Sequence, residues 1–275
     1  MKTVVNVKKY LTALKLTLTG TKKPISVALM LAFKSPPYHT TLISGQDLVS
    51  QDRYALFEKI MQEKTNKGGL SQYTYYSHGT QYTISGFNNA ATFFSTFVFK
   101  DWKRLNVKGK KVLDIGGYVG DTAIYFISQG ALKVLVYEPF PYSFRVALLN
   151  IKQNQLEDRI EIKNCALGGE DTFMIIDPEF VNNNETRAMS QERGVKIPVV
   201  TLDTIVKQYS IVDWCLKMNC EGCEYEVFQK ATTDTLRRFN EIYMHYHAEP
   251  DYLVNKLKSA GFRVKCTDYI HAIRI

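Results

Sequence analysis

The sequence lacks any apolar run long enough to cross a membrane as a helix. The longest candidate, Ile25 to Phe33, falls far short of the roughly 20 residues that such a helix needs. The N-terminal segment also lacks the uninterrupted apolar stretch of a secretory signal, because Lys8, Lys9 and Lys15 break it. We therefore expect no transmembrane segment and a cytoplasmic location.

Acidic residues are absent before Asp47, whereas the same stretch contains seven lysines. Without these lysines, the chain has 28 basic and 27 acidic residues, so the excess positive charge behind the net charge of +8 belongs to an N-terminal arm. A basic amphipathic helix there would lie on an anionic membrane or contact nucleic-acid phosphates. The alternative is a helix that packs on its own domain or on a second subunit. The residues on the apolar face of this helix are Val4, Val7, Leu11, Leu14 and Leu18.

Cysteines are few, and only their spacing is suggestive. Cys215, Cys220 and Cys223, with Cys266 later, match the C-x4-C-x2-C spacing of plant-type iron–sulfur proteins. An extended strand at about 3.3 Å per residue would hold Cys215 and Cys220 roughly 16 Å apart, too far to share a cluster. Cys220 and Cys223 alone suit a redox pair at a helix start. In a reducing compartment we expect small buried thiols instead.

Repeats and low-complexity tracts are also missing, and hydrophobic residues make up 45% of the chain, so a packed core is expected. Residues 1–105 are predicted to form an N-terminal extension, a basic amphipathic helix plus a small α+β region. The predicted elements are strands at 25–33 and 40–44, helices at 53–63 and 90–104, and a strand pair over 72–87 about a turn at 78–79.

Residues 106–275 show regular alternation of strand and helix patterns, which is typical of a parallel α/β sheet. Residues 173–176 and 196–202 are expected to form a hairpin across a polar loop, and residues 263–275 an antiparallel pair that closes the sheet. The remaining predicted elements are strands at 111–115, 133–137, 159–165, 213–218 and 241–245, and helices at 121–129 and 142–154.

The segment VLDIGGYVGDTAIYF, residues 112–126, is the strongest motif. A buried strand ends at Asp114, and glycines line the turn before a helix, where backbone N–H groups are available to a ligand. About 20 residues on, the next strand ends at Glu138, which suits a ribose diol. A nicotinamide cofactor fits this logic too. However, Asp114 would not help a phosphate-binding loop, whereas it suits the cationic amino-acid end of S-adenosylmethionine.

Five segments in order resemble the FkbM family of S-adenosylmethionine-dependent methyltransferases, over residues 109–264. After the glycine segment, EPFPYSFRVALLNIKQNQL (138–156) and IEIKNCALG (160–168) are similar to the next two family segments. VVTLDTI (199–205) and LKMNCEGCEYEVF (216–228) resemble the last two. The resemblance implies a Rossmann-like methyltransferase fold with a mostly parallel seven-stranded sheet and an antiparallel C-terminal strand.

The resemblance also implies a role for each matching position. The methionine end of the cofactor would contact the glycine turn, Glu138 would take the ribose hydroxyls, and residues 164–166 would edge the adenine. Tyr118 would face the cofactor or pack. The implied cofactor-binding residues are Asp114, Gly116, Gly117, Tyr118, Gly120, Asp121, Thr122, Glu138, Pro139, Asn164, Cys165 and Ala166.

One departure from the family pattern is Asn219, which stands where an Asp usually ends the fourth strand. An amide cannot act as a general base, although it can orient a substrate. Glu221 and His245 are therefore the candidate bases, against the alternatives of a helix cap for Glu221 and a hydrogen-bonded core histidine for His245. No compact ligand spacing indicates a metal site.

The sequence therefore predicts O-methylation of a small-molecule or sugar acceptor. An RNA or tRNA methyltransferase that uses the basic arm is the first alternative, although no Asn-Pro-Pro-Tyr or Asp-Pro-Pro-Tyr segment is present and the body is near neutral. A non-catalytic module that keeps the cofactor pocket is the second, because of Asn219. A nicotinamide oxidoreductase is the third.

Overall fold

The computed structural model describes residues 37–41, 47–51, 72–87, 90–176 and 194–275. The basic arm, the strand predicted at 25–33 and the helix predicted at 53–63 lie outside these residues. Two compact units are distinguished: residues 74–84 and 102–275 form one, and the rest of the described residues belong to the other. The predicted boundary near residue 105 stays a prediction. No described helix is long and apolar enough to cross a membrane.

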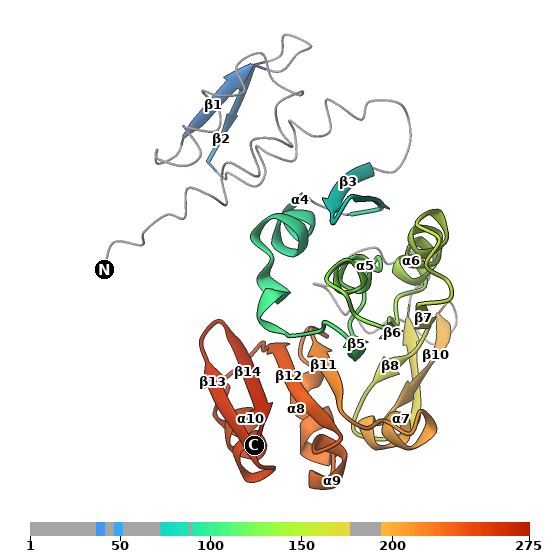
Figure 1. Cartoon of the computed structure of the whole chain (residues 1–275), viewed down its shortest axis with the longest axis vertical. Coiled ribbons are helices and arrows are strands. Elements are labelled where there is room, and N and C mark those ends of the chain that lie inside the picture. The colour runs from blue at the N-terminus through green and yellow to red at the C-terminus, as the bar shows by residue number, and fades with distance from the viewer. Residues whose placement is uncertain (1–36, 42–46, 52–71, 88–89, 177–193) are drawn as a thin grey trace. The chain divides into compact units, whose positions relative to one another are not determined.

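The larger unit is built on a seven-stranded sheet in the order β13-β14-β12-β11-β5-β6-β7 (Figure 1). Neighbours among β12, β11, β5, β6 and β7 pair in parallel, while β14 is antiparallel to both β12 and β13. The predicted fold, including its antiparallel C-terminal strand, is confirmed. The strands are β5 (Lys111–Ile115), β6 (Lys133–Tyr137), β7 (Ile160–Lys163), β11 (Trp214–Met218), β12 (Phe239–His245), β13 (Phe262–Cys266) and β14 (Tyr269–Arg274).

Helices cover the sheet because alternate strand residues point to opposite faces. Leu113, Leu216 and Ile242 of one face join a cluster with residues of the helices that follow β10. On the other face of the sheet, α5 contacts β5 and β6, and α6 contacts β7. The helices are α5 (Asp121–Ser128), α6 (Pro141–Gln153), α7 (Leu202–Gln208), α8 (Cys223–Lys230), α9 (Thr233–Leu236) and α10 (Asp251–Ser259).

A separate three-stranded sheet contains the predicted hairpin. Strands β9 (Thr172–Ile176) and β10 (Val195–Val200) pair antiparallel, as expected. Strand β8 (Ala166–Leu167), which pairs in parallel with β10, was not predicted. Two residues are too few to produce an alternating pattern, so only the pairing reveals this strand.

The described elements before β5 agree with the sequence analysis in part. The hairpin of β3 (Gln72–Ser77) and β4 (Thr80–Ser85) is confirmed, and β1 (Tyr38–Thr41) overlaps the strand predicted at 40–44. Strand β2 (Asp47–Ser50), which pairs with β1, was not predicted. The helix predicted at 90–104 is broken at Lys100, whose φ of 56° is left-handed and ends a helical path. It consists of α4 (Ala90–Phe93), a π-helical turn (Phe94–Phe99) and a 3-10 turn (Asp101–Arg104).

Candidate functional site

The glycine turn lies where the carboxyl ends of β5, β6 and β11 meet. The N–H groups of Gly116 and Gly117 both donate to the carbonyl oxygen of Tyr137, at 3.0 and 3.2 Å. Gly120, at a φ of 80°, is the N-cap of α5 and has no side chain to satisfy the helix terminus. The turn is therefore tied to the end of β6, with the amino end of α5 directly after it.

Glycine is required at position 116 for steric reasons. Its φ is 76°, and a Cβ there would lie 1.9 Å from the carbonyl oxygen of Asn219. The N–H of Asn219 in turn donates to the carbonyl oxygen of Ile115 at 3.0 Å. The close approach of these two backbones holds the end of β11 against the glycine turn, so the candidate cofactor and acceptor regions adjoin.

We expect Gly116→Ala to lower the free energy of unfolding by about 2–5 kcal/mol, because left-handed strain and overpacking add. Gly120→Ala is the matched control. Its φ is equally left-handed, but its added Cβ would meet the Cβ of Ala147 at an ordinary 3.4 Å. This variant should lose only the strain, about 1–2 kcal/mol. Chemical denaturation measures both, and equal losses would show that the contact with Asn219 contributes little.

Asp114 is fully buried and engaged by protein groups. Its Oδ2 accepts a hydrogen bond from Thr122 Oγ1 at 2.5 Å, and its Oδ1 lies 2.8 Å from the ammonium of Lys217. Lys217 also donates to the carbonyl oxygen of Gly116 at 2.7 Å, and its Nζ lies 5.0 Å from the ring centroid of Trp102. These contacts favour an indirect role for Asp114, which fixes the glycine turn through Lys217 and α5 through Thr122.

Glu138 follows β6 and accepts hydrogen bonds from the glycine turn and from the segment after β6. Its Oε2 accepts from the N–H of Tyr118 at 2.8 Å, and its Oε1 accepts from the N–H of Phe140 at 2.9 Å. Burial raises the pKa of Glu138 to about 8, against the lowering effect of these two hydrogen bonds and of Lys217. The carboxylate is therefore short of partners for its negative charge.

Asn164 lies beside the turn that contains Glu138. Its Nδ2 donates to the carbonyl oxygens of Glu138 and Pro139, at 2.9 and 2.8 Å. Cys165 follows and is buried, which raises the pKa of its thiol to about 11. Among the predicted cofactor-binding residues, those with partly exposed surface are Gly116, Tyr118, Pro139 and Asn164, and those that are buried are Asp114, Gly117, Gly120, Asp121, Thr122, Glu138, Cys165 and Ala166.

The chemistry of this donor set fits S-adenosylmethionine. A carboxylate offers about four lone-pair sites, and the two backbone hydrogen bonds to Glu138 leave capacity for the two hydroxyl donors of a ribose. The partly exposed turn at Gly116 and Tyr118 lies beside it, since Tyr118 itself donates to Glu138. The glycine turn offers no open cradle of N–H groups to a phosphate, because the N–H groups of Gly116 and Gly117 donate to Tyr137 and that of Tyr118 donates to Glu138.

The region after β11 brings Asn219 and His245 together. Asn219 Oδ1 lies 3.2 Å from Nδ1 of His245, at the end of the neighbouring strand β12. Because an amide oxygen only accepts, Nδ1 carries a proton, and in the neutral ring Nε2 then carries the lone pair. The His245 ring also packs against that of Tyr269, with centroids 5.1 Å apart.

Glu221 pairs with His247 and not with His245. Nε2 of His247 lies 3.3 Å from Glu221 Oε2, and Nδ1 lies 3.1 Å from Oε1 of the buried Glu224. Hydrogen bonds to Glu221 and Glu224 raise the pKa of His247 to about 10, so an imidazolium bridges the carboxylates at neutral pH. The bond to His247 lowers the pKa of Glu221. Glu221 does not cap α8, because the N-cap is Gly222.

The cysteines correct one expectation. Cys220 and Cys223 form a disulfide, so the prediction of small thiols is wrong for this pair. The geometry of a four-residue loop decides this pairing, whereas composition only suggested a reducing compartment. Cys165 and Cys215 are buried free thiols, and Cys266 is an exposed one. Within the described residues, no group of three or more His, Cys, Asp and Glu side chains is placed to hold a metal ion.

Two residues of the candidate site were not predicted from the sequence. Lys217 was quoted only as part of a family segment, although a lysine inside the buried strand β11 signals a charge that needs a partner. His247 was not among the candidate bases, and only the fold shows that both its nitrogens face carboxylates.

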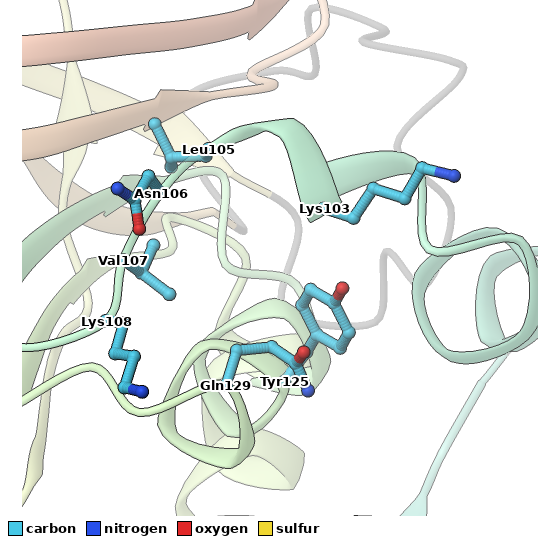
Figure 2. Close-up of a pocket in the computed structure, with 7 residues that line it drawn as sticks. All are labelled: Lys103, Leu105, Asn106, Val107, Lys108, Tyr125 and Gln129. Carbon is cyan, nitrogen blue, oxygen red and sulfur yellow. The ribbon is translucent and has the colours of Figure 1, made fainter.

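A cavity of about 280 Å³ lies away from this site (Figure 2). It is formed by the segment that leads into β5 and by α5, so it lies at the amino end of β5, opposite the glycine turn. Figure 2 shows the Lys103 side chain pointing away from that of Lys108. Because the cavity lies at the opposite end of β5 from the glycine turn, we assign it no part in the candidate site. Its lining residues are Lys103, Leu105, Asn106, Val107, Lys108, Tyr125 and Gln129.

The chain was compared with known proteins. The model of the methyltransferase FkbM domain matches residues 114–264. No protein of curated function shows significant similarity. Among solved structures, the FkbM methyltransferase of Methylobacillus flagellatus KT is 18% identical with a TM-score of 0.45, and the match covers 65% of this chain but 47% of that one.

Two other structures are similar at lower identity. TrmK of M. capricolum, solved with S-adenosyl-homocysteine, is 12% identical with a TM-score of 0.37, over 61% of this chain and 62% of that one. Magnesium protoporphyrin IX methyltransferase from Synechocystis PCC 6803, solved with bound SAM, is 11% identical with a TM-score of 0.36, over 62% of this chain and 72% of that one.

Proposed function

Because the chain belongs to the FkbM methyltransferase family, we propose that it is an S-adenosylmethionine-dependent methyltransferase that O-methylates a small-molecule or sugar acceptor. The observation that carries this proposal is the buried carboxylate of Glu138, which adjoins the glycine turn and has unused capacity for a sugar diol. Glycine turn and acid lie at the carboxyl ends of adjacent strands, where ligands of open α/β sheets bind.

The proposed cofactor contacts divide into two kinds. Gly116, Tyr118, Pro139 and Asn164 present accessible surface, so they are the groups that meet the nucleoside first. Asp114 acts from beneath, because its carboxylate holds Lys217 and Thr122, which fix the turn and the start of α5. Glu138 reorients little on binding, since two backbone N–H groups already hold it.

The proposed acceptor lies near Asn219 and His245. When bound, S-adenosylmethionine supplies an electrophilic methyl group, so alignment of the acceptor oxygen provides much of the rate enhancement. Asn219 holds His245 with Nδ1 protonated. Nε2 is then the nitrogen that takes the proton from the hydroxyl group of the methyl acceptor. Asn219 thus serves as a positioning residue in a place where the family usually has an acid.

Glu221 is the second candidate base, but its environment suits it less. Its hydrogen bond with the His247 imidazolium lowers its pKa, and a carboxylate of lowered pKa is a weaker proton acceptor. We therefore assign proton transfer to His245, while Glu221 and His247 form the wall of the acceptor site.

The test combines cofactor affinity with turnover. We expect wild-type protein to bind S-adenosyl-homocysteine in calorimetry and to transfer label from S-adenosylmethionine to one member of a panel of hydroxylated small molecules and sugars. His245→Gln should reduce turnover by about 100-fold or more without changing that affinity. The matched control is His78→Gln in the exposed turn between β3 and β4. Absence of cofactor affinity in the wild type would overturn the proposal.

The same experiment also tests the nucleic-acid alternative. Transfer of label to tRNA, with binding that weakens steeply with salt, would replace the small acceptor by RNA. Affinity for the cofactor without turnover on any acceptor would instead indicate a non-catalytic module.

A further inference from the structure

The disulfide between Cys220 and Cys223 encloses the residues that shape the acceptor side of the site. Cys220 follows Asn219, and Cys223 is the first residue of α8. Between them lie only Glu221 and Gly222. The four-residue ring therefore connects the end of β11 to the start of α8, and the side chain of Glu221 projects from it toward His247.

Both enclosed residues have left-handed backbones. Glu221 has a φ of 57°, and Gly222 has a φ of 113°. For a residue with a Cβ, the left-handed region is sterically unfavourable, so glutamate stays there only when its surroundings hold it. The two anchors of this loop are the disulfide and the hydrogen bond from the N–H of Cys220 to Glu224 Oε1, at 3.1 Å.

A cross-link over so few residues does little for global stability, since the loop-closure entropy it removes from the unfolded chain grows with loop length. Its effect is local: it restricts the backbone of Glu221. Both cysteines are partly exposed, in contrast to the buried thiols of Cys165 and Cys215. This partial exposure favours attack by a small reductant, whereas a fully buried pair would be shielded from it.

We propose that Cys220 and Cys223 form a redox-active pair that exchanges reversibly with dithiols, and that the disulfide holds Glu221 against His247. A thiolate of the dithiol attacks one sulfur, forms a mixed disulfide and displaces the other cysteine as a thiolate. The second thiol of the reductant then displaces the remaining cysteine. Two electrons and two protons pass from the dithiol to the protein, which gains two thiols as the reductant becomes a cyclic disulfide.

In the reduced state, Glu221 is released from its left-handed conformation. The loop can then relax to the ordinary backbone region, which turns the carboxylate away from His247. His247 keeps the contact to Glu224, a buried residue in the first turn of α8, but loses the contact to Glu221. The oxidation state of the pair thus sets one wall of the proposed acceptor site.

The first experiment measures the exchange itself. Full-length native protein is equilibrated with mixtures of reduced and oxidised dithiothreitol, alkylated and digested with trypsin. Cleavage after Lys217 and Lys230 releases both cysteines in one peptide, residues 218–230. We expect this peptide to carry either no label or two, with a midpoint inside the buffer range. Cys266, exposed and outside the pair, is the labelling control. A peptide that stays fully oxidised or fully reduced in every native mixture would overturn the proposal.

The second experiment measures the coupling to Glu221 through the NMR titration of His247. In the oxidised protein this histidine should titrate near its pKa of about 10. On reduction, and in the Cys220→Ser/Cys223→Ser double variant, the pKa should fall toward the ordinary value of 6.5. Cys266→Ser, as control, should leave it unchanged. An unaltered pKa after full reduction would show that the disulfide does not position Glu221. Neither readout requires methyl transfer, so failure here is distinct from failure of the proposed function.

Discussion

Replacing Lys217 with methionine is expected to lower the free energy of unfolding by about 3–5 kcal/mol, because it leaves a buried carboxylate without its counter-charge. The side chains of Lys217 and Asp114 are 1% and 0% exposed, so water cannot solvate the survivor. Methionine has a similar length and fills the volume, which confines the loss to charge and hydrogen bonds. Chemical denaturation monitored by circular dichroism gives the value.

Two comparisons separate the charge effect from packing. The double variant Lys217→Met/Asp114→Leu should be more stable than Lys217→Met alone, because no charge remains buried. Lys110→Met is the matched control for removal of a paired lysine. Lys110 is 26% exposed, and its partner Glu241 keeps a contact of 2.8 Å to His271, so we expect a loss below about 1 kcal/mol. If both lysine variants lose equally, the buried pair is not the element that secures the glycine turn.

Affinity for S-adenosyl-homocysteine should rise with pH as Glu138 ionises. The pKa of Glu138 is raised to about 8 by burial, so in most unliganded molecules the Glu138 carboxyl group is protonated at neutral pH. Two ribose hydroxyls prefer the carboxylate, so binding should release up to one proton below pH 8 and gain affinity until the pH passes that value. Calorimetry in buffers of different ionisation enthalpy measures the proton release.

The variant Glu138→Gln should bind about 10- to 100-fold more weakly at pH 8.5 and should lose the pH dependence, since hydrogen bonds to a charged acceptor are replaced by weaker ones. Because the ligand is unchanged, titration of its own amino group cancels between the two proteins. Glu161→Gln on β7 is the control, an exposed glutamate whose pKa is lowered by its bond to Lys163. A wild-type affinity that is flat between pH 6 and 8.5 would contradict ribose binding by Glu138.

Stability provides an independent check on the same residue. A carboxyl group whose folded pKa lies above its unfolded value of 4.5 contributes stability below that value, and this contribution is lost as the pH rises through about 8. Glu138→Gln should therefore be more stable than the wild type at pH 9 and not at pH 5. This outcome needs no ligand, so it tests the burial of Glu138 apart from cofactor binding.

Much of the sheet could be predicted from local pattern. Buried parallel strands are continuous apolar runs that end in turn residues, and β5 and β6 were placed at their observed bounds for that reason. The predicted and observed elements differ where the sequence pattern is short or where the backbone conformation of one residue ends an element. β8 has only two residues, and the helix predicted over 90–104 is interrupted by a left-handed Lys100.

The candidate site was predicted as a set of residues, but not as a set of contacts. The order of glycine turn, Asp114 and Glu138 along the chain determines that they meet at one sheet edge, because parallel strands end together. Spacing along the chain contains no information on which side chains pair across strands. For that reason Glu221 and His245 were grouped, whereas the fold pairs Glu221 with His247 and His245 with Asn219.

By itself, the sequence determined the fold class, the family segments and the edge of the sheet at which the candidate site lies, since these follow from periodicity and from the positions of strand ends. The tertiary structure alone decided that Asp114 is neutralised by Lys217, that His247 lies between two carboxylates and that Cys220 is bonded to Cys223. The physical reason is that charge pairing and cross-linking depend on distances of a few ångströms between residues on different elements, and only packing sets those distances.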